Sequence, residues 1–87
     1  MRNVVKEILR SLGVGYALMI PTNDWTISFI HNGYIIDIKV TKSLLTKVLY
    51  MSLFRYDDGK IVEHHKEELT DITVEELREI MKDFIEG

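Results

Sequence analysis

Side chains capable of chemistry concentrate in one short run of the sequence, Glu63-His64-His65-Lys66-Glu67-Glu68. On a helix, His64 and Glu68 would share a face, but on a strand His64 and His65 would point to opposite faces and could not bind one ion. Zinc usually takes three or four protein ligands, and no further ligand stands at a suitable spacing. The H-E-x-x-H pattern is also absent. We therefore expect a solvent-facing polar segment and no metal site.

The remaining histidine, His31, is expected beside a hairpin tip and opposite Tyr34. A general base needs a nucleophile or substrate within hydrogen-bond reach, and Ser28 would face the other way. The sequence holds no phosphate-binding glycine loop, no G-x-S-x-G and no cysteine. We therefore expect no enzyme, no cofactor and no small-molecule substrate.

Length and composition indicate one ordinary globular domain over residues 1–87. The chain is 46% hydrophobic and 29% charged, and a chain of this size buries only about 60–65% of its unfolded surface, which leaves little for a deep cleft. A small secreted domain would usually carry disulfides, so the absence of cysteine favours a cytoplasmic protein. The charged N-terminus is unlike a secretory signal, and no apolar run approaches the ~20 residues of a membrane span.

Asn32-Gly33 is the strongest local signal, because this pair favours a two-residue type I′ hairpin turn. Folding the chain there fixes the register of strands over about 25–31 and 34–40. One face then pairs His31 with Tyr34, Phe29 with Ile36, Ile27 with Ile38 and Trp25 with Val40, and the reverse face pairs Ile30 with Ile35, Ser28 with Asp37 and Thr26 with Lys39. Turn chemistry and the alternation of apolar residues agree.

Helices are predicted at both ends of the chain. Apolar residues at helical spacing predict a first helix over 2–12, which Gly13 would end. Thr73 and Glu76 form a capping-box pattern before a second apolar stripe, so the last helix should span about 74–86. The chain is therefore expected to be an α+β protein with an N-terminal helix, an antiparallel β-meander and a C-terminal helix.

Two segments between these elements are less clearly patterned. A short strand over 16–20 should end in a turn over 21–24. After the first hairpin we expect a short helical connection near 42–47 and then a second hairpin of 48–56 and 60–65, with Asp57-Asp58-Gly59 as a three-residue loop. A helix from 42 to 56 is the competing interpretation, because leucines in this segment also fit a helical stripe.

The expected order of helix, three strands, short helix, two strands and helix resembles type III secretion chaperones and related small acidic dimers. The competing order of helix, three strands and two helices resembles some small phage-encoded anti-CRISPR proteins. That resemblance implies an inhibitor that blocks a nucleic-acid-binding effector with an acidic surface.

Charge divides the chain into two unequal parts. Residues 1–56 hold seven Lys/Arg against three Asp/Glu, a net charge of +4, and residues 57–87 hold four against eleven, a net charge of −7. Lys6, Arg10, Lys39 and Lys42 could serve a small nucleic-acid-binding regulator. The acidic balance of the whole chain argues against it, because phosphate binding normally uses a clustered basic face.

The apolar residues outnumber those that one covered sheet face can hide. Ile30 and Ile35 pair on the reverse of the hairpin, and Tyr50, Met51 and Phe54 are surplus as well. A second apolar patch implies a partner. We therefore expect a non-enzymatic protein-binding module, an adaptor, chaperone or inhibitor, that forms a homodimer. Its expected contact residues are Ile30, Ile35, Tyr50 and Phe54, with an acidic flank of Asp57, Asp58, Glu67 and Glu68.

Overall fold

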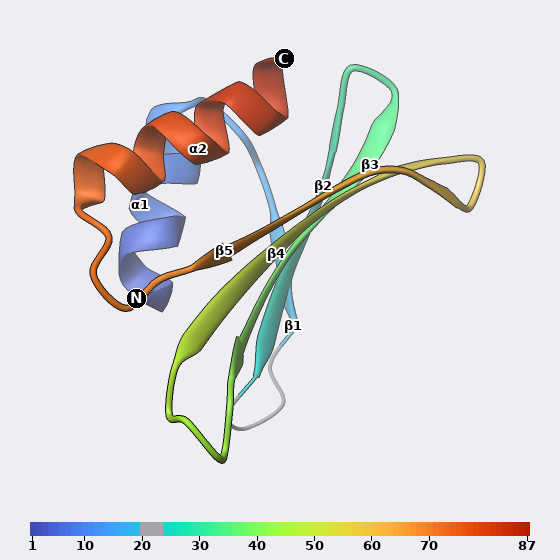
Figure 1. Ribbon diagram of the computed structural model, residues 1–87. Coiled ribbons are helices and arrows are strands. Elements are labelled where there is room, and N and C mark those ends of the chain that lie inside the picture. The colour runs from blue at the N-terminus through green and yellow to red at the C-terminus, as the bar shows by residue number, and fades with distance from the viewer. Residues whose placement is uncertain (20–23) are drawn as a thin grey trace.

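Two helices lie on one side of a five-stranded antiparallel sheet in the computed structural model, which describes residues 1–19 and 24–87 (Figure 1). The elements are α1 (Arg2–Ser11), β1 (Ala17–Met19), β2 (Trp25–His31), β3 (Tyr34–Lys42), β4 (Leu49–Asp57), β5 (Lys60–Glu68) and α2 (Val74–Glu86). The strands follow one another across the sheet in chain order. The α+β prediction is confirmed, whereas most of the predicted turn over 21–24 lies outside the described residues.

The first hairpin has the predicted register. Asn32 and Gly33 both adopt positive φ angles, 51° and 80°, as a type I′ turn requires. His31 pairs with Tyr34, and the ladder continues to Trp25 and Val40. Burial alternates along both strands, so turn chemistry and period-two burial set the same register.

The predicted helical connection near 42–47 is wrong, and so is the competing helix from 42 to 56. Strand β3 continues to Lys42, and a short loop leads to β4 at Leu49. The loop is closed by the amide of Ser43 donating to Val48 and that of Lys47 donating to Ser43, at 2.9 and 2.8 Å. Beyond it Met51 and Leu53 are buried and the residues between and beside them are only half-buried, as expected for a strand with one covered face.

The second hairpin is present, but its turn has two residues. Asp57 pairs with Lys60, which leaves Asp58 and Gly59 as the turn, with φ angles of 51° and 78°. The register then shifts, because Arg55 pairs with Glu63 while Tyr56 pairs with Ile61. Val62 is therefore an extra residue in β5, a β-bulge that increases the local twist.

The observed topology contradicts the element order on which each of the two family resemblances was based. Both required a helix after the third strand, and between β3 and β5 the described residues hold only β4 and two loops. The two chain orders that suggested these families are therefore incorrect, and the sheet is an uninterrupted meander.

The core lies between the helices and the sheet. Thr73 caps α2 by accepting a hydrogen bond from the Glu76 amide at 3.1 Å, as the capping-box pattern predicted. Met51 is fully buried here, so its prediction as a surplus surface residue is wrong. The other buried side chains are Val5, Ile8, Leu9, Trp25, Ile27, Phe29, Ile36, Ile38, Val40, Leu53, Leu69, Leu77, Met81, Phe84 and Ile85.

Candidate functional site

The sheet has a second face, which points away from both helices (Figure 1). Within residues 1–19 and 24–87 no helix or loop covers it. We call it the open face. Its side chains come from the positions that alternate with the buried ones, and the strand register arranges them in rows that run across the sheet.

One row consists of three isoleucines and a tyrosine and lies at the end of the open face nearest the two hairpin turns. It contains Ile30, Ile35, Tyr56 and Ile61 from four successive strands. Ile30 is 74% exposed, Ile35 49% and Ile61 57%. Phe54 stands next to this row on β4. We call these five side chains the apolar end, and a cluster of this kind marks an interaction surface more often than scattered single residues do.

Aromatic packing holds this end of the face in a fixed shape. The rings of Phe54 and His64 stack with centroids 4.6 Å apart and an interplanar angle of 6°. Phe54 also lies 6.0 Å from Tyr56. Partial burial, and secondarily the Asp37 carboxylate, raise the pKa of Tyr56 above its ordinary value of 10.0. The rings therefore form a preorganised platform on β4 and β5.

The other half of the open face is polar, and its charges balance. Ser28 donates to Asp37 at 2.6 Å, and Lys66 lies 4.7 Å from the ring centre of Tyr50. Two acidic residues, Asp37 and Glu68, and two basic ones, Lys39 and Lys66, project from the described positions of this face. Its formal charge is therefore zero with His64 neutral, which does not suit a polyanion.

The predicted acidic flank divides between two places. Asp57 ends β4 and Asp58 begins the β4–β5 turn, directly beyond the apolar end. Glu68 lies at the far end of the open face, opposite Tyr50, while Glu67 pairs with the buried Met51 and so belongs to the helix side. The structure thus brings Ile30, Ile35, Phe54 and the two aspartates together, and it places Tyr50, Glu67 and Glu68 elsewhere.

The sequence analysis did not predict that the most exposed apolar residues would lie on the surface. Leu44 is 84% and Leu45 96% exposed in the β3–β4 loop. We call residues 42–47 the dileucine loop, since Lys42 and Lys47 flank the pair. Both leucines fit a helical stripe, which favoured the helical interpretation of this segment. The signal that could have identified them as surface residues is the pair of adjacent leucines between two lysines.

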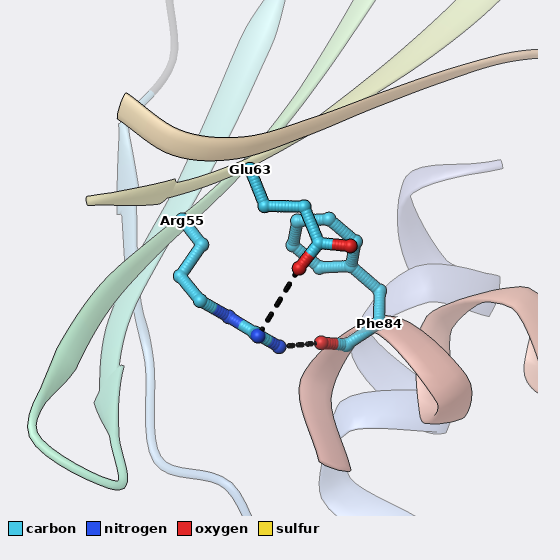
Figure 2. Close-up of polar contacts among 3 residues, drawn as sticks. All are labelled: Arg55, Glu63 and Phe84. Atoms are coloured by element: carbon cyan, nitrogen blue, oxygen red, sulfur yellow. Dashed lines mark hydrogen bonds and ion pairs between the residues drawn. The ribbon is translucent and has the colours of Figure 1, made fainter. Parts of the chain in front are cut away.

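Arg55 is a charged side chain that joins the two layers (Figure 2). It is 15% exposed, and its Nη1 lies 3.2 Å from the Glu63 carboxylate while Nη2 donates to the carbonyl oxygen of Phe84. The guanidinium also lies 5.6 and 5.1 Å from the ring centres of Tyr34 and Phe84. These contacts engage both terminal nitrogens of the guanidinium, so Arg55 fastens α2 to the sheet.

Several small hollows lie on the described surface. Four of them hold about 230–270 Å³ each, below the 300–1,000 Å³ of typical ligand sites. His64 and His65 point to opposite faces, as predicted for a strand, since they pair with Phe54 and Leu53. In the described ranges no three His, Asp or Glu side chains gather as metal ligands would.

The residues predicted for nucleic-acid binding do not converge. Lys6 and Arg10 lie on α1, and Arg10 is 3.7 Å from Glu7. Lys39 projects from the open face and Lys42 ends β3. The helix layer and the open face are on opposite sides of the sheet (Figure 1), so these four side chains form no common basic surface.

Comparison of the chain with family models, with curated proteins and with solved structures finds no match. Within the described residues, no helix is long and apolar enough to cross a membrane. The function must therefore be inferred from the geometry of the surface.

Proposed function

We propose that this chain is a non-enzymatic protein-binding module whose docking surface is the apolar end of the open face. The observation that carries the proposal is the exposed row of Ile30, Ile35 and Ile61 across neighbouring strands. Leaving such side chains in water forgoes about 25 cal/mol for each Å² that a partner would bury. The lack of cysteine suits a reducing compartment, and we place the module in the cytoplasm.

The face is a better docking surface than the β5 edge of the sheet. Strand β5 forms that edge, and its side chains are mostly charged or histidine. The bulge at Val62 also distorts it. Charged side chains and bulges are the devices by which edge strands resist pairing with another chain. Contact through side chains of the open face therefore remains the more favourable mode.

The surroundings of the apolar end define the chemistry of a partner. Asp57 and Asp58 stand at its border. An apolar segment flanked by lysine or arginine would bury its apolar side chains on the isoleucine row and place its cations beside these carboxylates. The partner class is thus a protein segment with apolar residues between basic ones.

The test uses a synthetic peptide with two adjacent leucines between lysines, titrated into the labelled full chain and followed by amide NMR shifts. The chain should carry Leu44→Ser and Leu45→Ser, so that its own leucines do not compete. We expect saturable shifts around Ile30, Ile35 and Ile61. Ile30→Asp with Ile35→Asp should weaken binding at least tenfold, as loss of about 1.4 kcal/mol or more implies.

Val74→Asp is the matched control, because Val74 is a β-branched residue 47% exposed on the helix side. It should leave the peptide affinity unchanged. Absence of any saturable shift, or equal binding by the double aspartate variant, would show that the apolar end is not a docking surface.

A further inference from the structure

We infer that the dileucine loop is a contact site for a membrane surface that carries anionic lipids. The loop and the apolar end lie at opposite ends of the sheet, so the inference goes beyond the proposed function and does not depend on it. Leu44 and Leu45 are the most exposed large hydrophobic residues described, at 84% and 96%. Lys42 and Lys47 flank them and are exposed as well. Apolar side chains and cations are the two features that attach a peripheral protein to an anionic bilayer.

Hydrogen bonds hold the two leucines at the tip of a closed turn. The Lys47 amide donates to the carbonyl oxygen of Ser43 at 2.8 Å, and the Ser43 amide donates to that of Val48 at 2.9 Å. Lys47 adopts a positive φ of 59°, which is uncommon for residues other than glycine. The leucines are therefore presented in a defined conformation, and binding through them requires little further ordering of the loop.

The flanking lysines are close enough to the leucines to act together with them. Lys42, Ser43, Leu44 and Lys47 line one hollow of about 230 Å³. Lysine side chains lay their aliphatic stems along apolar surfaces and keep the ammonium group in a polar environment. With the leucines at the boundary of the acyl chains, both ammonium groups therefore lie among the lipid phosphates.

Carboxylates at this end of the sheet lie behind the tip of the loop. Asp24 accepts a hydrogen bond from the Lys42 amide at 3.4 Å, so it stands level with the start of the loop. Glu68 and Asp71 line a hollow that Glu76 of α2 also borders, so they lie beside the start of that helix. The attraction of a charged surface falls off within a Debye length, about 10 Å at 0.1 M salt. The lysines, as the charges nearest the leucines, therefore decide the interaction.

A bilayer suits the loop better than a protein pocket does. The loop protrudes past the lower end of the sheet in Figure 1, and each leucine is almost fully exposed. Lysine is depleted in protein interfaces, whose apolar residues form a continuous patch. Anionic lipids, by contrast, are concentrated on the cytoplasmic leaflet of membranes, and the cytoplasm is the compartment in which we place the chain.

Attachment through the loop leaves the apolar end free for a partner. Ile35 and Lys42 are seven residues apart on β3, which is roughly 24 Å at about 3.4 Å per residue. A chain that rests on its dileucine loop thus holds the apolar end away from the bilayer. Even a single myristoyl chain gives only marginal membrane binding, so attachment by two leucines and two lysines should be reversible.

Co-sedimentation of the full chain with vesicles tests the site. The vesicles contain phosphatidylcholine, with or without phosphatidylserine. We expect saturable binding to the mixed vesicles, and Leu44→Ser with Leu45→Ser should weaken it at least tenfold while retaining the wild-type circular dichroism. Val62→Ser with Val74→Ser is the matched control, because these valines are 53% and 47% exposed outside the loop. Binding that the leucine variant leaves unchanged, or no binding by the wild-type chain, would overturn the inference.

The contribution of the lysines is measured separately. Lys42→Gln with Lys47→Asn should weaken binding to the mixed vesicles at least fivefold and leave binding to phosphatidylcholine alone unchanged. Asparagine is chosen at position 47 because it tolerates a positive φ. High salt should weaken binding of the wild-type chain in the same direction, because it screens the attraction. Affinity that depends on neither the lysines nor salt would refute the contact with anionic headgroups.

Fluorescence quenching shows whether the tip enters the bilayer. The indole of Leu45→Trp should be quenched by lipids brominated on their acyl chains, whereas that of Val62→Trp should not. Trp25 is only 9% exposed and gives the same background in both variants. Absence of quenching at position 45 would show that the leucines do not enter lipid and would overturn the inference in favour of a protein contact.

The outcomes separate this inference from the proposed function. Loop-dependent vesicle binding by a chain that binds no peptide would keep the membrane site and refute the docking surface at the apolar end. Peptide binding by a chain that binds no vesicles would do the reverse.

Discussion

Arg55 of β4 donates a hydrogen bond to the carbonyl oxygen of Phe84 in the last turn of α2 (Figure 2). The last carbonyls of a helix lack partners within it and carry a partial negative charge. The guanidinium supplies both a donor and a positive charge at this point, and it stacks on the Phe84 ring. This one side chain therefore closes the helix end and joins the two layers.

Arg55→Ala should lower the free energy of unfolding by about 2–3 kcal/mol, because it removes charge-assisted hydrogen bonds in a mostly buried setting. Glu63→Ala should cost less than about 1 kcal/mol, since Glu63 is 54% exposed and its ion pair is screened. Urea denaturation measures both. Equal losses for the two variants would show that the ion pair, not the helix end, is what Arg55 stabilises.

Adjacent isoleucines on β3 provide a test of the two faces. Ile36 is 1% exposed and Ile35 49%. Ile36→Ala should cost about 2–5 kcal/mol through lost burial and a cavity, while Ile35→Ala should cost the monomer less than about 1 kcal/mol. Urea denaturation of dilute protein gives both values, and a reversed order would place the core on the wrong side of the sheet.

Gly33 tests the turn conformation in isolation from packing. A Cβ at Gly33 would meet no heavy atom within 4 Å, but its φ is +80°. Gly33→Ala should therefore destabilise the chain by about 1–2 kcal/mol through backbone strain alone. Gly15 is equally open and lacks a positive φ, so Gly15→Ala should change stability by less than about 1 kcal/mol. Thermal unfolding of both variants makes the comparison, and similar losses would contradict the left-handed turn.

The raised pKa of Tyr56 predicts that the stability of the fold depends on pH in the alkaline range. Burial, and then Asp37, raise its pKa in the folded chain. Its stabilising contribution is fully present below the unfolded pKa of about 10 and is lost as the pH rises through the folded pKa, because the unfolded chain ionises more readily. Ultraviolet titration of tyrosinate should show the shift. Asp37→Asn should lower the pKa of Tyr56 partly, and Tyr56→Phe should remove that component of the titration.

Thr73→Ala should cost about 1 kcal/mol, since its side chain caps α2 by accepting from the Glu76 amide. Thr73→Ser keeps the hydroxyl and should retain most of the stability. Thermal unfolding with circular dichroism provides the measurement. A serine variant as unstable as the alanine variant would indicate that the methyl group, not the cap, matters.

The sequence predicts those elements whose local signals agree with tertiary burial. Asn32-Gly33 sets the first hairpin, and Thr73 marks the start of α2. The segment after β3 could not be predicted because Leu44 and Leu45 complete a helical stripe with residues that are in fact alternately buried in β4. The choice between the helical period and the strand period depends on which side of the sheet the helices cover, and that is a long-range relationship.

The candidate site shows the same division. Ile30 and Ile35 could be placed on the reverse of the hairpin, because the turn fixes their face. The grouping with Tyr56 and Ile61 could not be predicted, since it depends on the register of β3 with β4 and on the bulge at Val62. Tyr50 was expected in the group, but the register places it at the opposite end, beside Lys66.

The uninterrupted meander also affects how the chain folds while it is being synthesised. Each strand pairs with its immediate predecessor, so hairpins can zip as the chain leaves the ribosome, and few distant segments must find one another. Helix α1 precedes the strands and can cover part of the inner side of that sheet, but the rest stays exposed to water until α2, which brings Leu77, Met81, Phe84 and Ile85, has been synthesised. A translation product truncated before α2 would expose the apolar side chains on the inner side of the sheet. Quality-control proteases would therefore degrade it.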